Sequence, residues 1–209
     1  MTDRIIETEA CIAEGCAWLA EIEPRFAEAL HLTGPPPLRR RPGGFGPLLQ
    51  AICGQQLSVA SAGALWSKLC AVGADDPVGL LALSDEDLRA CGLSWAKIRY
   101  AKALAEAQVD YPSLAAMPEP EAIATLTALK GIGQWTAEIY LLVSVGRADV
   151  FAPGDLALQE AARDLFGLDE RPSEAALRDR AQAWSPWRGV AARLLWAYYR
   201  AIKSREGIV

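Results

Sequence analysis

A short glycine-rich turn is the part of the sequence best suited to bind a charged ligand. Gly131 and Gly133 flank Ile132, and apolar residues at helical spacing precede and follow this turn. Because glycine adopts backbone angles that other residues avoid, the spacing predicts a sharp connection between two helices. The second helix would begin with free N–H groups and the positive end of its dipole, so a phosphate could approach the bare backbone closely. Lys130, directly before the turn, would add a direct phosphate contact.

Two interpretations of this turn are open. As a phosphate-binding element, it would fix the position of a nucleic-acid backbone without reading its sequence. As a purely structural element, it would be an αα-hairpin whose glycines only permit tight packing of two helices. A Gly-x-Gly turn taken alone favours the structural interpretation, so residues elsewhere in the chain must decide.

A carboxylate further along the chain also has two interpretations. Asp155 comes directly after Pro153 and Gly154 and precedes a helical pattern. Aspartate is a preferred N-cap residue, so a capping role is the simplest explanation. A carboxylate held at a helix start beside an apolar cleft would also stabilise an oxocarbenium-like transition state or activate a water molecule.

The elements that must position these groups are predicted to be helical. Apolar residues recur at helical spacing, and no segment shows a convincing strand-like alternation. Ser84 and Asp87 have the spacing of a capping box. The fold class is therefore all-α, with loops at residues 35–47 and 146–154. The predicted helices cover residues 1–30 (one long helix or two short ones), 48–72, 84–90, 94–109, 120–129, 134–145, 155–166, 173–183 and 187–203.

Length and composition set the scale of the protein. The 209 residues, 52% of them hydrophobic and 22% charged, suit one large domain or two small lobes sharing a cleft. No apolar run reaches the roughly 20 residues that a membrane span needs, and the acidic start of the chain lacks the apolar region of a signal peptide. We therefore expect a soluble, cytoplasmic protein that does not bind a membrane.

Cysteine and histidine usage excludes several kinds of metal site. The five cysteines form no C-x-x-C pair, and His31 is the only histidine. A disulfide scaffold, a zinc ribbon and an iron–sulfur cluster are therefore not expected, and no metal site is predicted.

The charge balance allows a local nucleic-acid site but argues against a broad one. The net charge is −5, and basic clusters such as Lys97, Arg99 and Lys102 are interpreted as solvated surface. A phosphate held by backbone N–H groups needs no net positive charge on the protein.

Several segments together resemble the helix-hairpin-helix (HhH-GPD) DNA glycosylase superfamily, in its DNA-3-methyladenine glycosylase II branch. The resemblance runs from about residue 46 to 202, and the hairpin is its most specific part. The matching segments are residues 52–58 (ICGQQLS), Gly92-Leu93-Ser94 with Lys97 and Tyr100, residues 131–137 (GIGQWTA), and residues 184–188 (WSPWR) leading to residues 194–196 (LLW).

The resemblance implies a fold and an activity. It implies one helical domain over residues 1–209, in which two helical lobes surround a cleft, with the hairpin at about residues 121–145 and closing helices at 155–203. It resembles the compact form that lacks an N-terminal β-rich domain. The implied enzyme is a monofunctional N-glycosylase of base-excision repair, which flips alkylated bases such as 3-methyladenine or 7-methylguanine out of double-stranded DNA and hydrolyses the N-glycosidic bond.

The resemblance also assigns roles to residues. Asp155 takes the place of the catalytic carboxylate. Trp135 occupies the position where bifunctional relatives carry a lysine nucleophile, so no lyase activity is expected. An indole there would attract a cationic alkylated base. Trp187 and Tyr140 are further candidates for the base-stacking pocket, although packing explains Trp187 equally well and Tyr140 better. The residues expected at the DNA backbone are Lys130, Gly131, Ile132, Gly133, Gln134 and Thr136.

The implied DNA wedge and cofactors complete the expectation. The side chain that fills the gap left by a flipped base should be Gln56 or Leu57, with Gln55 a weaker candidate, and Leu57 could equally belong to the core. No cofactor is expected, although a monovalent cation at the hairpin stays open, and the protein is expected to act as a monomer.

Other functions fit parts of the pattern. One is a non-catalytic DNA-binding scaffold, and another is a glycosylase for neutral deaminated or etheno bases. A bifunctional glycosylase/lyase for oxidised bases and an unrelated helical binding protein are less well supported. Asp155 before a helix, together with Trp135, favours the alkylbase glycosylase.

Overall fold

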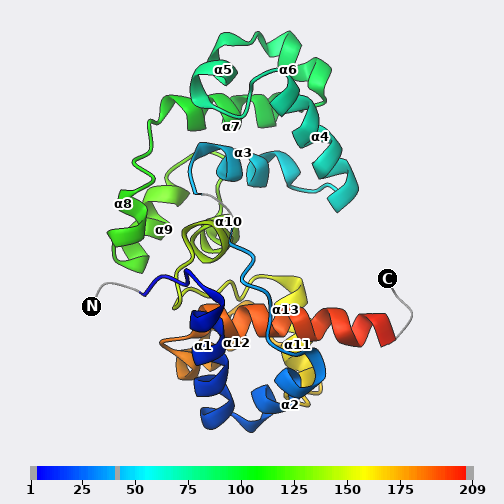
Figure 1. The fold of residues 1–209 in the computed structure, drawn as a ribbon. Coiled ribbons are helices and arrows are strands. Elements are labelled where there is room, and N and C mark those ends of the chain that lie inside the picture. Colours follow the sequence, from blue (N-terminus) through cyan, green and yellow to red (C-terminus); the bar gives the residue numbers. More distant parts are fainter. Residues whose placement is uncertain (1–3, 41–42, 206–209) are drawn as a thin grey trace. The chain divides into compact units, whose positions relative to one another are not determined.

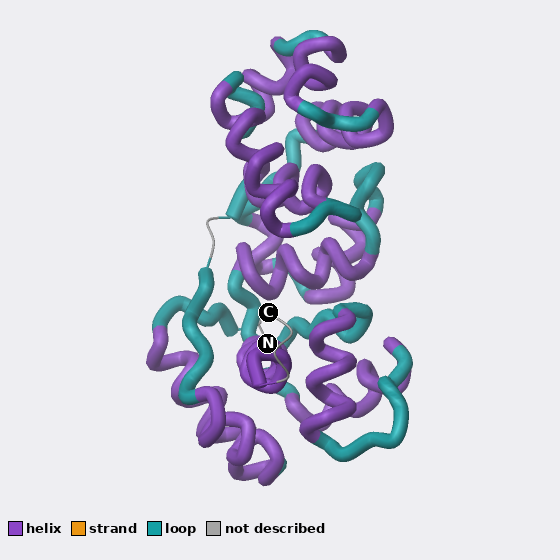
Figure 2. Tube along the Cα trace, turned by 90° about the vertical axis from the view of Figure 1, so that its right-hand side faces the viewer, coloured by secondary structure: helices purple, strands orange, loops and turns teal. Residues whose placement is uncertain are grey.

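The computed structural model describes residues 4–40 and 43–205, and within these ranges the chain is built from helices and connecting turns (Figures 1 and 2). No β-strand is found in these ranges; one isolated antiparallel bridge joins Ile5 to Arg147. The all-α prediction is therefore confirmed. No helix in the described ranges is both long and apolar enough to cross a lipid bilayer.

The chain divides into two compact units. One unit joins the residues up to Arg40 with those from Leu141 onward, and the other runs from Arg41 to Tyr140. The helices of the second unit are α3 (Phe45–Gly54), α4 (Val59–Ala71), α5 (Pro77–Ala82), α6 (Asp85–Cys91), α7 (Trp95–Glu106), α8 (Ser113–Ala116), α9 (Glu119–Thr127) and α10 (Gln134–Tyr140).

The core of this 41–140 unit lies where α3 packs against α4 and α7. Its fully buried side chains include Leu48 and Ile52 of α3, Leu69 of α4 and Ile98 of α7. Burial of such side chains, at about 1.5–3 kcal/mol each, is the main force that holds α3 and α7 together.

The other unit is organised around its last helix. Its elements are α1 (Glu9–Ile22), α2 (Pro24–Thr33), the π-helical segment η1 (Leu141–Val145), α11 (Leu156–Leu165), α12 (Glu174–Ala181), the 3₁₀ segment η2 (Gln182–Trp184) and α13 (Arg188–Arg205). Helix α13 packs against α2, α11 and α1. An aromatic cluster adds to this core, in which the Trp184 ring lies 5.2 Å from that of Phe26 and 5.7 Å from that of Phe166.

Local signals in the sequence place several helix ends correctly. Ser84 and Asp87 form the predicted capping box at the start of α6, and Gly92 ends that helix in a left-handed conformation. Asp155 is the N-cap of α11, where its side chain accepts a hydrogen bond from the N–H of Leu158. These ends depend on neighbouring residues alone, which explains why the sequence predicts them.

Two predicted helices differ from those observed. The prediction of one helix over residues 48–72 is wrong, because the chain turns between Gly54 and Val59. There Gln56 has a left-handed φ of 60° and Ser58 caps α4. The helix predicted over residues 134–145 is α-helical only to Tyr140 and then π-helical from Leu141 to Val145.

Candidate functional site

The predicted hairpin connects α9 to α10, and its two glycines have different surroundings. Gly131 has a φ of 88°, and a Cβ atom there would lie 2.5 Å from the ring of Tyr100 in α7. Gly133 has open space where a Cβ atom would stand. Ile132, between them, is buried. Gly131 is therefore needed to form the turn, whereas Gly133 leaves its backbone accessible from outside.

The turn between α3 and α4 presents the two predicted wedge residues. Gln56 is exposed, and the Leu57 side chain is 42% exposed. Leu57 therefore does not belong to the core, which removes the structural alternative for this residue. A large apolar side chain held outside the core on a tight turn is suited to insertion into a stack of bases.

Hydrogen bonds join this turn to the hairpin. The side-chain amide of Gln55 donates to the carbonyl oxygen of Gly131 at 3.0 Å and lies 3.5 Å from the hydroxyl of Thr136. The Lys97 ammonium donates to the carbonyl oxygens of Cys53 and Gln55 at 2.7 and 2.8 Å. The interpretation of Lys97 as solvated surface is therefore wrong, because its charge is bound to the end of α3.

A pocket of about 570 Å³ opens between the turn and the hairpin. Trp135, whose side chain is 42% exposed, forms part of its lining. The volume falls within the range of about 300–1,000 Å³ that is usual for small-molecule sites. The pocket is lined by Ala51, Gly54, Gln55, Gln56, Leu57, Gly131, Gly133, Trp135 and Thr136. It brings together the predicted wedge, the hairpin glycines and the predicted stacking residue.

The other predicted hairpin residues differ in exposure. Lys130 and Gln134 are exposed, and the Gln134 amide donates to Glu138 at 2.9 Å. Thr136 is buried beneath Gln55, so its side chain supports the turn. The expected contact of Thr136 with DNA stays a prediction, as do those of the other hairpin residues.

Tyr140 and Trp187 are both buried. The Tyr140 hydroxyl accepts a hydrogen bond from the N–H of Gly44 at 2.8 Å, which holds the start of α3. The Trp187 ring packs against Gly15, where a Cβ atom would lie 2.8 Å away, and carries the Arg4 guanidinium 4.4 Å from its centroid. The structure thus gives both side chains packing contacts, and their roles in a base-stacking pocket stay predictions.

Asp155 belongs to the unit built around α13. Its carboxylate is half-buried, and Oδ1 accepts hydrogen bonds from the N–H of Leu158 and from the indole N–H of Trp196, both at 3.1 Å. Sequence reasoning missed this contact of Trp196, since no local signal links residues on separate helices. The capping and catalytic interpretations of Asp155 are compatible. Both of these hydrogen bonds are accepted by Oδ1, and they hold the carboxylate in one orientation without removing its charge.

The loop before Asp155 is held from two sides. The N-terminal segment binds it through the N–H of Ile6, which donates to Gly146 at 2.7 Å, and through Arg4, whose carbonyl accepts from Ala148 at 2.8 Å. On the other side, the Asp149 carboxylate accepts from the Arg188 guanidinium at 2.8 Å. The predicted loop at 146–154 is therefore a buried connection that fixes where α11 begins.

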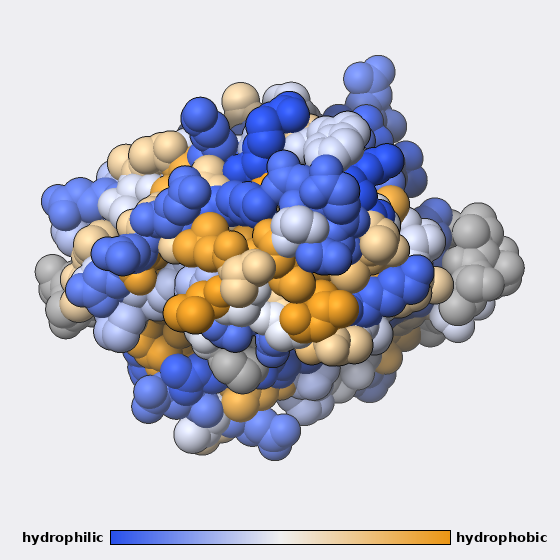
Figure 3. Space-filling model, turned by 90° about the horizontal axis from the view of Figure 1, so that it is seen from above, coloured by the Kyte–Doolittle hydropathy of each residue, from blue (hydrophilic) through white to orange (hydrophobic). Residues whose placement is uncertain are grey.

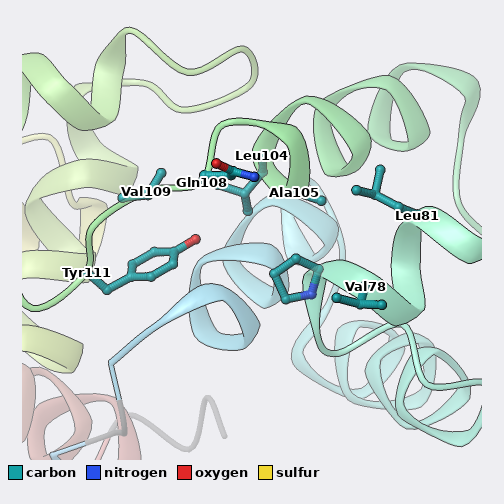
Figure 4. Close-up of a pocket in the computed structure, with 8 residues that line it drawn as sticks. Val78, Leu81, Leu104, Ala105, Gln108, Val109 and Tyr111 are labelled. Atoms are coloured by element: carbon teal, nitrogen blue, oxygen red, sulfur yellow. The ribbon is translucent and has the colours of Figure 1, made fainter.

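A second pocket in the 41–140 unit has a different character. It measures about 210 Å³ and lies between α5 and the end of α7. Its lining is mostly apolar, and the Tyr111 hydroxyl points into the space (Figure 4). Burial raises the pKa of Tyr111, whose hydroxyl has no hydrogen-bond partner in the described part of the chain. The pocket offers neither a cation nor a bare glycine backbone, so it is unsuited to phosphate.

Two α5 residues that line this pocket, Val78 and Leu81, are apolar and exposed. Val78 is 79% exposed and Leu81 is 43% exposed. Figure 3, which looks onto α5 and α6 from above, shows apolar side chains gathered among hydrophilic ones. Of these two pockets, the one beside the hairpin holds the residues that the sequence motifs singled out.

Comparison with known proteins gives consistent results. An alkylbase DNA glycosidase-like protein of Schizosaccharomyces pombe, mag2, is 28% identical over 190 residues, which are 85% of this chain and 89% of the relative. The structure of the 3-methyladenine DNA glycosylase Mag1 of S. pombe in complex with abasic DNA matches with a TM-score of 0.77 and 27% identity, covering 88% of this chain and 95% of that one. The DNA-3-methyladenine glycosidase of Bacillus halodurans matches with a TM-score of 0.81 and 30% identity, covering 98% of this chain and 95% of that one.

The family model agrees with these relatives and with the motifs of the sequence. The model of the HhH-GPD superfamily base excision DNA repair proteins matches residues 49–186. These include the hairpin, Asp155 and the turn between α3 and α4 that carries Gln56 and Leu57, here named the wedge turn. The resemblance stated from the motifs is confirmed, and this chain belongs to the HhH-GPD superfamily of base excision DNA repair proteins.

Proposed function

We propose that this protein is a monofunctional DNA glycosylase of the DNA-3-methyladenine type, which removes alkylated bases from double-stranded DNA. The observation that carries the proposal is the pocket beside the hairpin, which is lined by Gly133, Leu57 and the exposed indole of Trp135. A backbone anchor, a wedge and an aromatic surface are the parts that base flipping requires. The protein would act as a monomer and without a cofactor.

The hairpin would anchor the DNA backbone. The open space at Gly133 lets a phosphate reach the main-chain N–H groups, and Lys130 is exposed beside it. Contacts of this kind fix the position of the enzyme without selecting a sequence.

The turn after α3 would open the duplex. Leu57 or Gln56, both exposed, would fill the space that the flipped nucleotide leaves. Insertion of such a side chain replaces part of the lost base stacking, and so keeps the damaged base outside the helix.

Trp135 would select the damaged base. A base alkylated on a ring nitrogen carries a positive charge, and the face of an indole attracts a cation by about 0.5–2 kcal/mol. The same charge makes the base a good leaving group, so the site needs little acid catalysis.

Asp155 would carry out the hydrolysis. As the bond between the base nitrogen and C1′ breaks, its electron pair leaves with the base and positive charge develops on the sugar. The carboxylate, held by Leu158 and Trp196, would stabilise this oxocarbenium-like state or take the proton of the attacking water, whose oxygen bonds to C1′. Since Trp135 stands in the lysine position of the bifunctional relatives, no Schiff base forms and the abasic strand stays intact.

Release of methylated bases tests the proposal. In buffer containing EDTA, the purified protein should release 3-methyladenine or 7-methylguanine from methylated duplex DNA, measured by chromatography, and should leave abasic sites uncut. Asp155→Asn should lower the rate by about 100-fold or more, while anisotropy shows that binding to a duplex with a tetrahydrofuran abasic analogue persists.

A companion variant tests the orientation of the carboxylate. Trp196→Phe keeps the Asp155 charge but removes one of its two named donors. It should give an intermediate loss of about 10-fold, which corresponds to the low end of the roughly 1.5–3 kcal/mol of one hydrogen bond to a charged group. Full activity of Asp155→Asn would exclude Asp155 as the catalytic carboxylate, and absence of base release by the unmodified protein would favour a non-catalytic scaffold.

A further inference from the structure

Helix α7 supports the wedge turn and the hairpin from the same side. Lys97 and Tyr100 lie one helical turn apart, so their side chains point to the same face of α7. Lys97 binds the end of α3, and the ring of Tyr100 lies against Gly131 of the hairpin. One face of α7 therefore contacts both elements that the proposed function assigns to DNA.

Lys97 is well placed to fix the end of α3. Its ammonium donates to the carbonyl oxygens of Cys53 and Gln55, at 2.7 and 2.8 Å, where the helix ends and its carbonyls have lost their intrahelical partners. A cation at this end also interacts favourably with the helix dipole. The side chain is half-buried, so water competes only partly for the contact.

Gln55 connects this contact to the hairpin. Its carbonyl oxygen accepts from Lys97, while its side-chain amide donates to Gly131 at 3.0 Å. The next residue, Gln56, has a φ of 60°, a conformation that non-glycine residues adopt only when their surroundings hold them there. The wedge residues thus follow directly after a backbone position that is bound from two sides.

We propose that Lys97 and Gln55 are positioning residues for base flipping. They would hold the Gln56–Leu57 turn in one geometry relative to the hairpin, so that the wedge enters the base stack while the hairpin holds the backbone. The inference rests on the proposed function, but it concerns insertion of the wedge rather than the chemistry at Asp155. A turn released from these contacts would move back when it meets the stacked bases and would not extrude the damaged nucleotide.

The test compares variants in α7 and at the end of α3, each of which changes one contact. Lys97→Met keeps an unbranched apolar stem without the ammonium, Lys97→Arg restores donors for the carbonyls, and Gln55→Leu removes the link to Gly131. Lys102→Met is the matched control, because Lys102 lies on the same helix but pairs with Asp85. Thermal unfolding of each variant identifies those that are merely unfolded.

Two measurements separate positioning from stability. The first is the single-turnover rate of 7-methylguanine release from two duplexes. In one duplex the lesion is paired with cytosine. In the other it faces an abasic analogue, so flipping the lesion costs less free energy. The second is the fluorescence of 2-aminopurine placed beside a tetrahydrofuran site, which reports wedge insertion without catalysis.

The proposal predicts a selective loss. Lys97→Met and Gln55→Leu should slow release from the paired duplex by about 10- to 100-fold, in line with a displacement of about 1 Å in a positioned group. The rate of release from the duplex with the unpaired lesion should fall less than threefold. The 2-aminopurine fluorescence change should weaken by about the same factor as the rate of release from the paired duplex. Lys97→Arg should recover most of the activity, and Lys102→Met should behave as the unmodified protein.

Other outcomes overturn the inference. Equal losses on both duplexes, or losses that Lys102→Met reproduces, would show a general effect on stability or charge. Unchanged 2-aminopurine fluorescence in Lys97→Met and Gln55→Leu would show that the wedge is held without these residues. If the unmodified protein inserts its wedge but releases no base, the proposed function fails while the positioning role is still measured by fluorescence.

Discussion

Trp135 shows at the scale of one residue how exposure and chemistry combine. An indole is a large apolar group, and this one keeps 42% of its surface exposed at the rim of a pocket. The helix that carries it buries Thr136 and Ala137 instead. Part of the Trp135 indole surface is therefore accessible from the pocket.

Replacement of Trp135 tests its preference for charge. Trp135→Ala should lower kcat/KM for cationic 7-methylguanine about 3- to 30-fold more than for a neutral base such as ethenoadenine, because only the cation gains about 0.5–2 kcal/mol from the indole face. Base release from matched oligonucleotides measures both values. Equal losses on the two substrates would exclude the cation–π explanation.

The cysteines illustrate how local hydrogen bonds set reactivity. The pKa of the Cys11 thiol is lowered to about 7, chiefly by the hydroxyl of Thr8 and then by backbone groups of Glu7 and Thr8. Burial raises the pKa of the Cys53 thiol to about 12. Partial desolvation, followed by the charge of Asp75, raises the pKa of the Cys70 thiol. Near neutral pH, the reactive thiolate is therefore concentrated at Cys11.

Alkylation as a function of pH checks this order. Iodoacetamide should modify Cys11 first, with a rate that rises through a midpoint near pH 7 because the depressed pKa leaves the thiolate present above that value. Peptide mass spectrometry follows each site. In Thr8→Val the midpoint should move to higher pH, and faster modification of Cys70 than of Cys11 at pH 7 would contradict the assignment.

At the scale of elements, the hairpin combines a structural glycine with an accessible one. Gly131 is required by its positive φ and by the ring of Tyr100, whereas Gly133 meets neither constraint. Tight packing accounts for Gly131, whereas the backbone at Gly133 is accessible. The contact of Gly133 with phosphate stays a prediction.

Substitutions at the two glycines should affect different properties: one should lower stability, and the other should weaken DNA binding. Gly131→Ala should lower the free energy of unfolding by about 2 kcal/mol or more, through left-handed strain and the clash with Tyr100. Gly133→Asp should keep stability within about 0.5 kcal/mol, since aspartate is a good N-cap, but should weaken binding to abasic duplex about tenfold or more by repelling phosphate. Chemical denaturation and anisotropy measure the two properties.

A charge-matched control completes this comparison. Ala107→Asp adds the same charge at an exposed position after α7 and should leave DNA affinity within about twofold, because exposed charges at a distance are largely screened. Unchanged affinity of Gly133→Asp would show that the hairpin does not carry the backbone contact.

At the scale of the whole molecule, the net charge of −5 limits how DNA is held. A protein that binds through many lysines and arginines releases a counterion at each phosphate, so its affinity falls steeply with salt. In the basic cluster on α7, Lys97 is bound by α3 carbonyls and Lys102 pairs with Asp85 in a partly exposed ion pair. These two cations are thus less available to phosphate than their place in a basic cluster suggests.

The dependence of affinity on salt measures this directly. For the abasic duplex, log K against log [salt] should have a slope of about −3 or shallower, since each neutralised phosphate contributes about −0.9. Anisotropy titrations between low and physiological salt give the slope. A value steeper than about −6 would show a broad basic face and would contradict backbone-dominated binding.

The sequence by itself determined the helical fold, most helix ends, the hairpin and the family. These depend on residues close together in the chain: apolar spacing along a helix, Ser84 with Asp87, and glycines flanking Ile132. It also named Asp155 and Trp135 as candidates through the family resemblance, and their roles stay predictions. The break after α3 escaped prediction, because the apolar pattern continues through the turn and Gln56 is held left-handed by its surroundings.

Only the tertiary structure decided which residues hold these groups in place. Gln55 reaches Gly131 across 76 positions, Lys97 reaches Cys53 across 44, and Trp196 reaches Asp155 across 41. Leu57 is exposed and Lys97 half-buried for the same reason, since packing of whole helices sets which side chains meet. Helical periodicity shows which face of each helix is apolar, but only the packed helices show which neighbour that face meets.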